Sequence, residues 1–239
     1  MSKYSRVLSA LLVLALVLGA ISVFVVSKVV HERRLEWRET NLKVAFLILS
    51  GYDAENNGLP RRHKDGAGRV LGSWRFGTLR YTGWQNWKEW PNADMAATWD
   101  APANRAIASE RFIYCFANNV PEEERCHTNI YAVTGPGTAF DPRHRGHLHD
   151  LPPATIVLIE VAHSGVHWMA PGDLSIDDVP ESIARGVDGD GVFVGFADES
   201  VAFLRNDVPV EVLKLFFTVE GAAKHDRWDL LGPFVLRMR

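Results

Sequence analysis

Histidines gather in two short segments of the chain, and their side chains are possible metal ligands. RHRGHLHD contains His144, His147 and His149, and AHSGVHW contains His163 and His167. Neutral imidazoles bind zinc and copper well, and in an extended chain His147 and His149 would face the same side. The arginines and proline around the first segment are instead typical of a solvated loop, and no H-E-x-x-H spacing is present. The histidines support a metal-dependent enzyme only as a third hypothesis, and our prediction is no metal and no other cofactor.

Acidic side chains are the second set of candidates. Asp188, Asp190 and Asp198 lie in VDGDGVFVGFAD, where Asp and Gly alternate as in calcium loops, but the EF-hand spacing with its terminal glutamate is missing. Glu160 lies in the apolar segment ATIVLIEVA, so we expect it to reach an arginine, a backbone amide or a strand end. No nucleophile-elbow, phosphate-loop, dinucleotide-binding or Cys-His motif is present. We therefore predict no catalytic residue and no enzymatic activity.

Tryptophans form a possible ligand platform. Trp84, Trp87 and Trp90 are three residues apart, so in a helical turn their rings would lie on roughly one side. A row of exposed rings would suit a module that binds cell-surface polysaccharide, which is our alternative function. The other interpretation is that the rings cover a domain that has few other large apolar residues here.

Two cysteines, Cys115 and Cys126, leave two interpretations open. The loop between them is short enough to be closed by a disulfide, which would indicate an oxidising compartment. The alternative is two unrelated buried thiols. Their spacing does not match a zinc site.

A long apolar run precedes all of these residues. Residues 7–26 carry no charge, and a helix of that length crosses a hydrocarbon core of about 30 Å. A cleaved signal peptide is the competing interpretation. We predict a short tail at 1–6, a transmembrane helix at 7–30 that contacts the lipid bilayer, its amphipathic continuation at 31–58, and a globular domain at 59–239. Basic residues after the run would place that domain in the cytoplasm, but large domains can translocate despite such charge, and we predict a single-pass protein with most of the chain extracytoplasmic.

The rest of the chain predicts a helix first and a sheet later. Leu35, Leu42 and Leu49 recur every seven residues along an amphipathic helix, which should end at the segment NNGLP, residues 56–60. A short helix is expected at 100–112 and a last helix from Asp207 to about residue 218. Alternating or continuous apolar residues predict strands at 129–134, at 154–162, and on both sides of the Asp198-Glu199 pair.

Composition excludes one class of function. The 239 residues carry a net charge of −3, and 47% of them are hydrophobic. This suits one globular domain with an appendage and lacks the basic signature of a nucleic-acid-binding protein, so we expect no nucleic-acid partner.

Several segments, taken in order, resemble a family of pilin-like proteins of unknown function that is abundant in planctomycetes. They are NLKVAFLILSGYDAENNGLP, SWRFGTLRY, WDAPANRAIASERFIYC, TNIYAVTGPGTAF, ATIVLIEVAHSGVHWMAPGDL and GVFVGFADESVAFL. The resemblance implies an extracytoplasmic α+β domain in which a long amino-terminal helix packs on an antiparallel sheet, as in pilins and pseudopilins, with Glu160 and Trp168 among the motif positions. It implies no known activity.

This chain departs from the family pattern at both ends. The prepilin processing motif is absent, which argues against assembly into a filament and favours an anchored monomer or small oligomer. Where the family has His-x9-Asp-Gly, this chain has Asp188, nine residues, and Asp198-Glu199. We expect Asp198 and Glu199 to be the two central residues of a tight type I′ hairpin turn, with Glu199 strained there.

The preferred functional hypothesis follows from these features together. We predict a membrane-anchored, pilin-like envelope protein with a structural or interaction role, whose partners are pilin-like or other envelope proteins.

Overall fold

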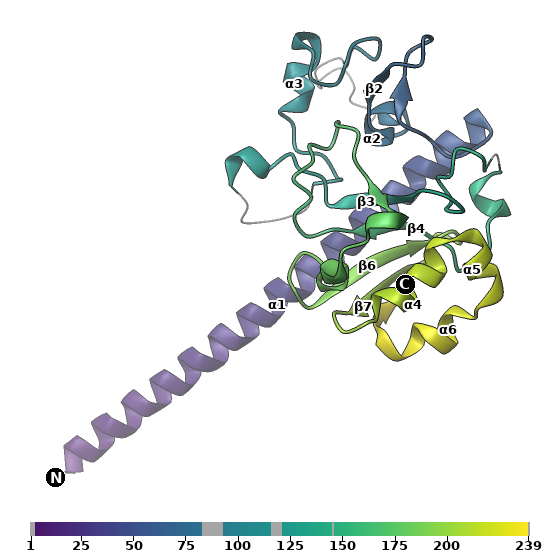
Figure 1. Ribbon diagram of the computed structural model, residues 1–239. Coiled ribbons are helices and arrows are strands. Elements are labelled where there is room, and N and C mark those ends of the chain that lie inside the picture. Colours follow the sequence, from purple (N-terminus) through teal and green to yellow (C-terminus); the bar gives the residue numbers. More distant parts are fainter. Residues whose placement is uncertain (1–2, 83–92, 116–120, 145, 239) are drawn as a thin grey trace. The chain divides into compact units, whose positions relative to one another are not determined.

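The computed structural model describes residues 3–82, 93–115, 121–144 and 146–238 (Figure 1). Helix α1 spans Lys3–Asn56, and its side chains are described from residue 13 onward, except at residue 15. The chain divides into two compact units, residues 1–39 and residues 40–239. Within the described residues, no helix combines the length and the apolar character needed to cross a membrane. The predicted span at 7–26 lies partly outside the side chains described.

The end of α1 matches the sequence prediction. The helix stops at Asn56, and the next two residues have the positive φ that breaks a helix, 53° at Asn57 and 143° at Gly58. Asn tolerates this conformation better than most residues do, and Pro60 prevents the helix from resuming. The helix therefore gives way to an irregular segment that runs from residue 57 to the first strand.

The main sheet has six strands in the order β5-β3-β4-β6-β7-β8. The strands are β3 (Ile130–Thr134), β4 (Ile156–Glu160), β5 (Leu174–Ser175), β6 (Gly191–Phe196), β7 (Val201–Arg205) and β8 (Val235–Met238). All neighbouring pairs are antiparallel except β3 and β5, which are parallel. The α+β class is confirmed, but the expectation of a purely antiparallel sheet was wrong. After β4, the chain crosses to the far edge of β3 before forming β5, and such a crossover produces a parallel pair.

Both faces of the sheet are covered. Helices α4 (Val210–Phe217), α5 (Val219–Lys224) and α6 (Arg227–Leu230) lie over one face (Figure 1), where they share a core with Val192, Val194 and Phe196 of β6. The alternate residue Gly195 points to the other face. A Cβ atom there would lie 2.2 Å from the Phe46 ring, so glycine allows residues 40–56 of α1 to pack against the strand.

Smaller elements connect α1 to the sheet. They are β1 (His63–Lys64), β2 (Val70–Gly72), α2 (Trp74–Gly77) and α3 (Arg105–Ala108). The helix expected at 100–112 is shorter than predicted: a 3₁₀ turn at Pro102–Asn104 leads into α3, and the helix ends at Ala108. Tertiary packing explains the early end, because Phe112 is buried and stacks on Trp168 at 5.2 Å between ring centroids.

A buried ion pair joins α2 to the sheet. Arg75 Nη1 lies 2.7 Å from Asp173 Oδ1, with side-chain exposures of 0% and 5%. The guanidinium also donates to the backbone carbonyls of Trp168, Ile130 and Gly172. Asp173 Oδ1 accepts the backbone N–H of Ala132 in β3 at 3.0 Å. Removing one partner of such a pair typically costs about 3–5 kcal/mol, because the other charge is left buried and unpaired.

The β6–β7 hairpin has a different turn from the one expected. The backbone N–H of Glu199 donates to the Phe196 carbonyl at 2.9 Å, and Phe196 N–H donates to the Ser200 carbonyl at 2.9 Å. Among the described residues, only Asn57 and Glu199 are non-glycine residues with positive φ, so Asp198 is not left-handed. This is a three-residue loop: a type I turn centred on Ala197 and Asp198, followed by one left-handed residue. The type I′ prediction was wrong because the loop holds one residue more than that turn.

The two acidic side chains of this loop each hold a neighbouring element. Asp198 binds the Arg227 guanidinium with both carboxylate oxygens, at 2.5 and 3.2 Å. Burial alone would raise the pKa of Asp198, but hydrogen bonds from Arg227 and Ser200 outweigh that effect and hold the pKa below its usual value. Glu199 Oε1 accepts the hydroxyl of Ser50 in α1 at 2.6 Å. The acidic pair is structural.

Replacing Glu199 should therefore have the opposite effect from replacing Asp198. We expect Glu199→Gly to raise the melting temperature by a few degrees, because glycine removes about 1 kcal/mol of left-handed strain. Asp198→Gly should lower it, since the Arg227 contact is lost. Glu199→Gly also loses the hydrogen bond from Ser50. Ser50→Ala removes that bond alone, so its change in melting temperature can be subtracted from that of Glu199→Gly. A higher melting temperature in both glycine variants would instead indicate the type I′ turn.

Candidate metal centre and basic cavity

Asp188, Asp190 and Asp198, which alternate with glycine as in calcium loops, do not all come together. Asp188 precedes β6 and Asp198 follows it, and the six-residue strand between them spans roughly 20 Å. Glu160, by contrast, has a partner of the expected kind: its Oε2 accepts the backbone N–H of Phe193 at 3.1 Å. Trp168 is fully buried and donates its ring N–H to the Glu110 carbonyl at 3.1 Å. These motif positions therefore serve packing and hydrogen bonding.

Of the other two candidate sites, the tryptophan row and the cysteine pair, the structure describes only the cysteine pair. Trp84, Trp87 and Trp90 lie outside the described residues, so the polysaccharide platform stays a prediction. Cys115 and Cys126 are buried free thiols in this structure. Burial raises the pKa of Cys115 to about 12 and also raises that of Cys126, so neither thiol is a ready nucleophile at neutral pH.

His167 has a structural role in its segment. Its Nε2 lies 2.8 Å from the Ala108 carbonyl, its Nδ1 accepts the backbone N–H of Met169, and its ring stacks on Trp99. Both ring nitrogens are thus used, with the proton on Nε2. Burial lowers the pKa of His167 below the ordinary value of 6.5. His163, from the same segment, is exposed.

The other histidine segment brings two imidazoles together with an acid from α1. Asp53, His147 and His149 each offer a ligand atom, and these atoms all lie within 4.8 Å of one another. Asp53 Oδ1 is 3.3 Å from His147 Nδ1, and the two imidazole rings stack with centroids 5.0 Å apart. His147 and His149 do lie on one side, but not through the extended chain that was expected: His147 has extended backbone angles, and His149 lies in the 3₁₀ turn Leu148–Asp150.

Asp53 also fixes the histidine loop to the end of α1. Its Oδ2 accepts the backbone N–H of Leu148 at 3.0 Å, and Leu148 is itself buried. This leaves Oδ1 facing His147. Although it is buried, Oδ1 has no hydrogen bond within the described part of the chain. Buried carboxylate oxygens are normally satisfied, so this atom is an open ligand position.

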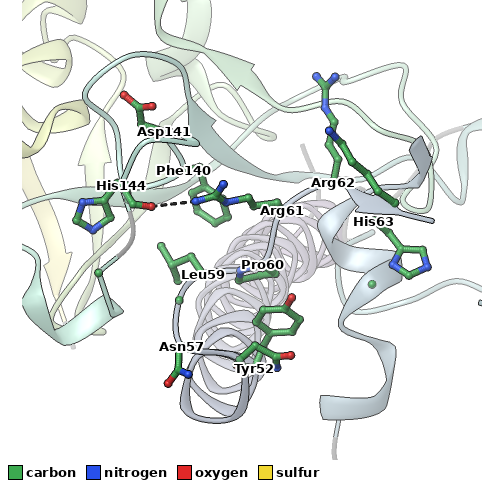
Figure 2. Close-up of a pocket in the computed structure, with 16 residues that line it drawn as sticks. Tyr52, Asn57, Leu59, Pro60, Arg61, Arg62, His63, Phe140, Asp141 and His144 are labelled. Carbon is green, nitrogen blue, oxygen red and sulfur yellow. Dashed lines mark hydrogen bonds between the residues drawn. The ribbon is translucent and has the colours of Figure 1, made fainter. Parts of the chain in front are cut away.

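A basic cavity of about 440 Å³ lies at the same end of the domain. The segment after α1 lines it with Arg61, Arg62 and Lys64, and Phe140 and His144 line another side. Figure 2 shows Arg61 reaching to the backbone carbonyl of His144, which accepts its hydrogen bond at 3.0 Å. Within the described residues, Arg62 and Lys64 form no ion pair. The same three basic residues also line a second cavity of about 570 Å³.

The acidic side chain in the first cavity is already neutralised. Asp141 binds Arg143 through both carboxylate oxygens and accepts the backbone N–H of Gly137. These bonds, first among them the side-chain contacts with Arg143, hold its pKa well below the usual range. Among the described residues that line this cavity, Asp141 is the only acid, so the charge facing the space is positive.

Asp53 and the basic residues of the cavity were not among the functional residues predicted from the sequence. Asp53 lies in the last turn of α1, where the helix dipole disfavours a negative charge. An acid in that position needs nearby hydrogen-bond donors. This requirement could have indicated from the sequence that Asp53 has tertiary partners. The basic run at 61–64 was interpreted only as a surface loop, because sequence does not show that the loop borders a cavity.

Comparison with known proteins adds no relative: no family model, curated protein or solved structure matches this chain.

The His167 geometry predicts a pH dependence of stability. Its pKa is lower in the folded protein than in the unfolded chain, so the unfolded chain binds the additional proton. Stability should fall as the pH drops below about 6.5, the pKa of an unperturbed histidine. Melting temperatures measured across that range should fall less steeply for His167→Gln than for wild type. His163→Gln, at an exposed position, is the control, and an equal slope in all three proteins would refute the assignment.

Proposed function

We propose that this protein is a single-pass membrane protein of the cell envelope whose exposed α+β domain binds an anionic group of an envelope partner. The observation that carries the proposal is the basic cavity beside the end of α1. The sequence predicts an interaction role, and the cavity suggests that the group bound is an anion.

Apolar character all around the amino-terminal helix supports the membrane anchor. Described apolar side chains between residues 13 and 30 are exposed, including Leu16, Val23 and Phe24 at 67 to 71%. A helix that is apolar on every side is stable when surrounded by other apolar groups, and a bilayer provides them. The anchor would hold the domain at the membrane surface.

A pilin-like arrangement is the finer form of this proposal. A long amino-terminal helix followed by a sheet, with residues 40–56 packed on one strand, is compatible with the pilin and pseudopilin pattern that the sequence resembles. In this form of the proposal the protein is a permanently anchored monomer or small oligomer. The resemblance to the planctomycete family thus suggests the architecture, and the cavity suggests the binding function.

The charge around the cavity favours an anionic ligand group. Arg61, Arg62 and Lys64 provide three positive charges, and Asp141 is occupied by Arg143. Arginine donates in a planar fork that matches phosphate or carboxylate. Tyr52 and Phe140 provide aromatic walls, so the cavity can hold an anion attached to a larger organic group.

The anchor predicts where the full chain is found. In a cell fractionation, we expect full-length protein in the membrane fraction, released by detergent and not by high salt. A variant that lacks residues 7–26 should move to the soluble fraction. Recovery of the full-length chain in the soluble cytosol, with no membrane-bound form, would refute the anchor.

The cavity predicts measurable anion binding. We expect full-length protein in nonionic detergent to bind inorganic phosphate in a calorimetric titration, with affinity that falls as salt rises. Arg62→Gln combined with Lys64→Gln should weaken binding about tenfold or more, because two charge-assisted contacts are lost. Both side chains are exposed, so the fold should persist.

A matched control removes the same charge elsewhere. Lys214→Gln combined with Lys224→Gln deletes two positive charges from α4 and α5, one on a half-buried and one on an exposed side chain, and should leave phosphate binding unchanged. Equal weakening in both double variants would mean that net charge alone attracts the anion. No binding by the wild-type protein up to about 10 mM phosphate, well above the range of a specific site, would refute the proposed function.

A further inference from the structure

We propose that Asp53, His147 and His149 form a binding site for a late first-row divalent metal ion, with Zn²⁺ as the representative ion. The inference rests on the contacts of these three side chains and does not depend on the anion-binding function. It also reverses the sequence-based prediction of no metal.

The spacing of the ligand atoms fits such an ion. Ligand atoms about 2.0–2.1 Å from a tetrahedral Zn²⁺ lie about 3.3–3.4 Å from one another. Asp53 Oδ1 and His147 Nδ1 are already 3.3 Å apart. The ligand atom of His149 lies within 4.8 Å of both. The His149 side chain is 75% exposed, so rotation of its ring can close the remaining gap.

Burial and hydrogen bonding also favour a metal between these groups. The Asp53 side chain is only 7% exposed, and its Oδ1 has no hydrogen bond in the described part of the chain. A cation would supply the missing partner for this atom. Asp53 Oδ2 meanwhile remains bonded to Leu148 N–H, which holds the carboxylate in place.

A neighbouring acid, Asp150, contacts the histidine loop at two points. Asp150 Oδ2 accepts the backbone N–H of His147 at 2.9 Å, and its Oδ1 lies 3.5 Å from His149 Nε2. A carboxylate hydrogen-bonded to a ligating imidazole orients the ring and makes it a stronger ligand. Asp150 thus holds the backbone at His147 and lies beside the ring of His149.

The ligand set selects the class of ion. Two imidazoles and one carboxylate suit Zn²⁺, Cu²⁺, Ni²⁺ or Fe²⁺, whereas Ca²⁺ and Mg²⁺ prefer oxygen ligands alone. Three protein ligands leave at least one coordination position for water or an external ligand. Gly146, next to His147, lines the basic cavity, so the open position and the cavity belong to the same loop.

Titration of the untagged, full-length protein with Zn²⁺ after treatment with a chelator tests the site. We expect one Zn²⁺ per chain, and a rise in melting temperature on adding the ion. His149→Ala should weaken binding at least about 100-fold, since even changes in outer contacts can cost 10- to 100-fold. The exposed position of His149 means that this variant should fold normally. Mg²⁺ at the same concentration should not bind.

Two further variants separate a metal site from a structural contact. His163→Ala removes an exposed histidine outside the cluster and should bind Zn²⁺ like wild type. Asp53→Asn keeps an oxygen that can accept the Leu148 N–H but removes the charge, so it should fold and bind Zn²⁺ more weakly. Equal affinity of wild type, His149→Ala and Asp53→Asn would show adventitious binding only and overturn the proposal, as would the absence of binding at about 1 mM Zn²⁺, beyond the range of specific affinities.

Discussion

The buried pair of Arg75 and Asp173 is the interaction on which the arrangement of this domain depends. A guanidinium removed from water must have nearly all of its donors satisfied, and here they meet one carboxylate and three backbone carbonyls. Those acceptors belong to segments far apart in the sequence. The charge can be buried only when β3, the segment before β5 and α2 are all in place, so one ion pair makes the folding of these segments interdependent.

Regular structure also positions the cavity and the histidine cluster. Arg61 and Arg62 lie between two fixed points, the end of α1 at Asn56 and the short strand pair β1–β2 that leads into α2, and Lys64 lies in β1 itself. Asp53 adds a third fixed point by bonding the loop at Leu148. The irregular segments that carry Arg61, Arg62 and the histidines are therefore positioned from both sides by regular structure, as binding loops usually are.

The acids that resemble a functional site in the sequence have structural roles, and an acid that the sequence did not single out belongs to the candidate metal site. Asp198 and Glu199 resemble a site in the sequence, yet each holds a neighbouring element, Arg227 in one case and Ser50 in the other. Asp53 was not predicted from the sequence to be functional, yet its buried Oδ1 has no hydrogen bond within the described residues. An acid at a turn has many local donors available, whereas an acid at the carboxyl end of a helix meets acceptors and must find its partners in the tertiary structure.

Features that depend on neighbours along the chain could be predicted from the sequence. Periodicity and helix-breaking residues account for the end of α1 at NNGLP, the strands at 130–134 and 156–160, the hairpin and helix α4. The helix at α4 was expected to be the last, but α5, α6 and β8 follow it. The backbone partner of Glu160 follows from the cost of burying a charge. The remaining features depend on contacts that form only in the folded domain. The parallel β3–β5 pair, the turn type at Asp198, the approach of Asp53 to His147 and His149, and the cavity beside Arg61 all require contacts between distant segments. Such contacts leave no periodic signal, because they depend on where the folded core brings separate parts of the chain together.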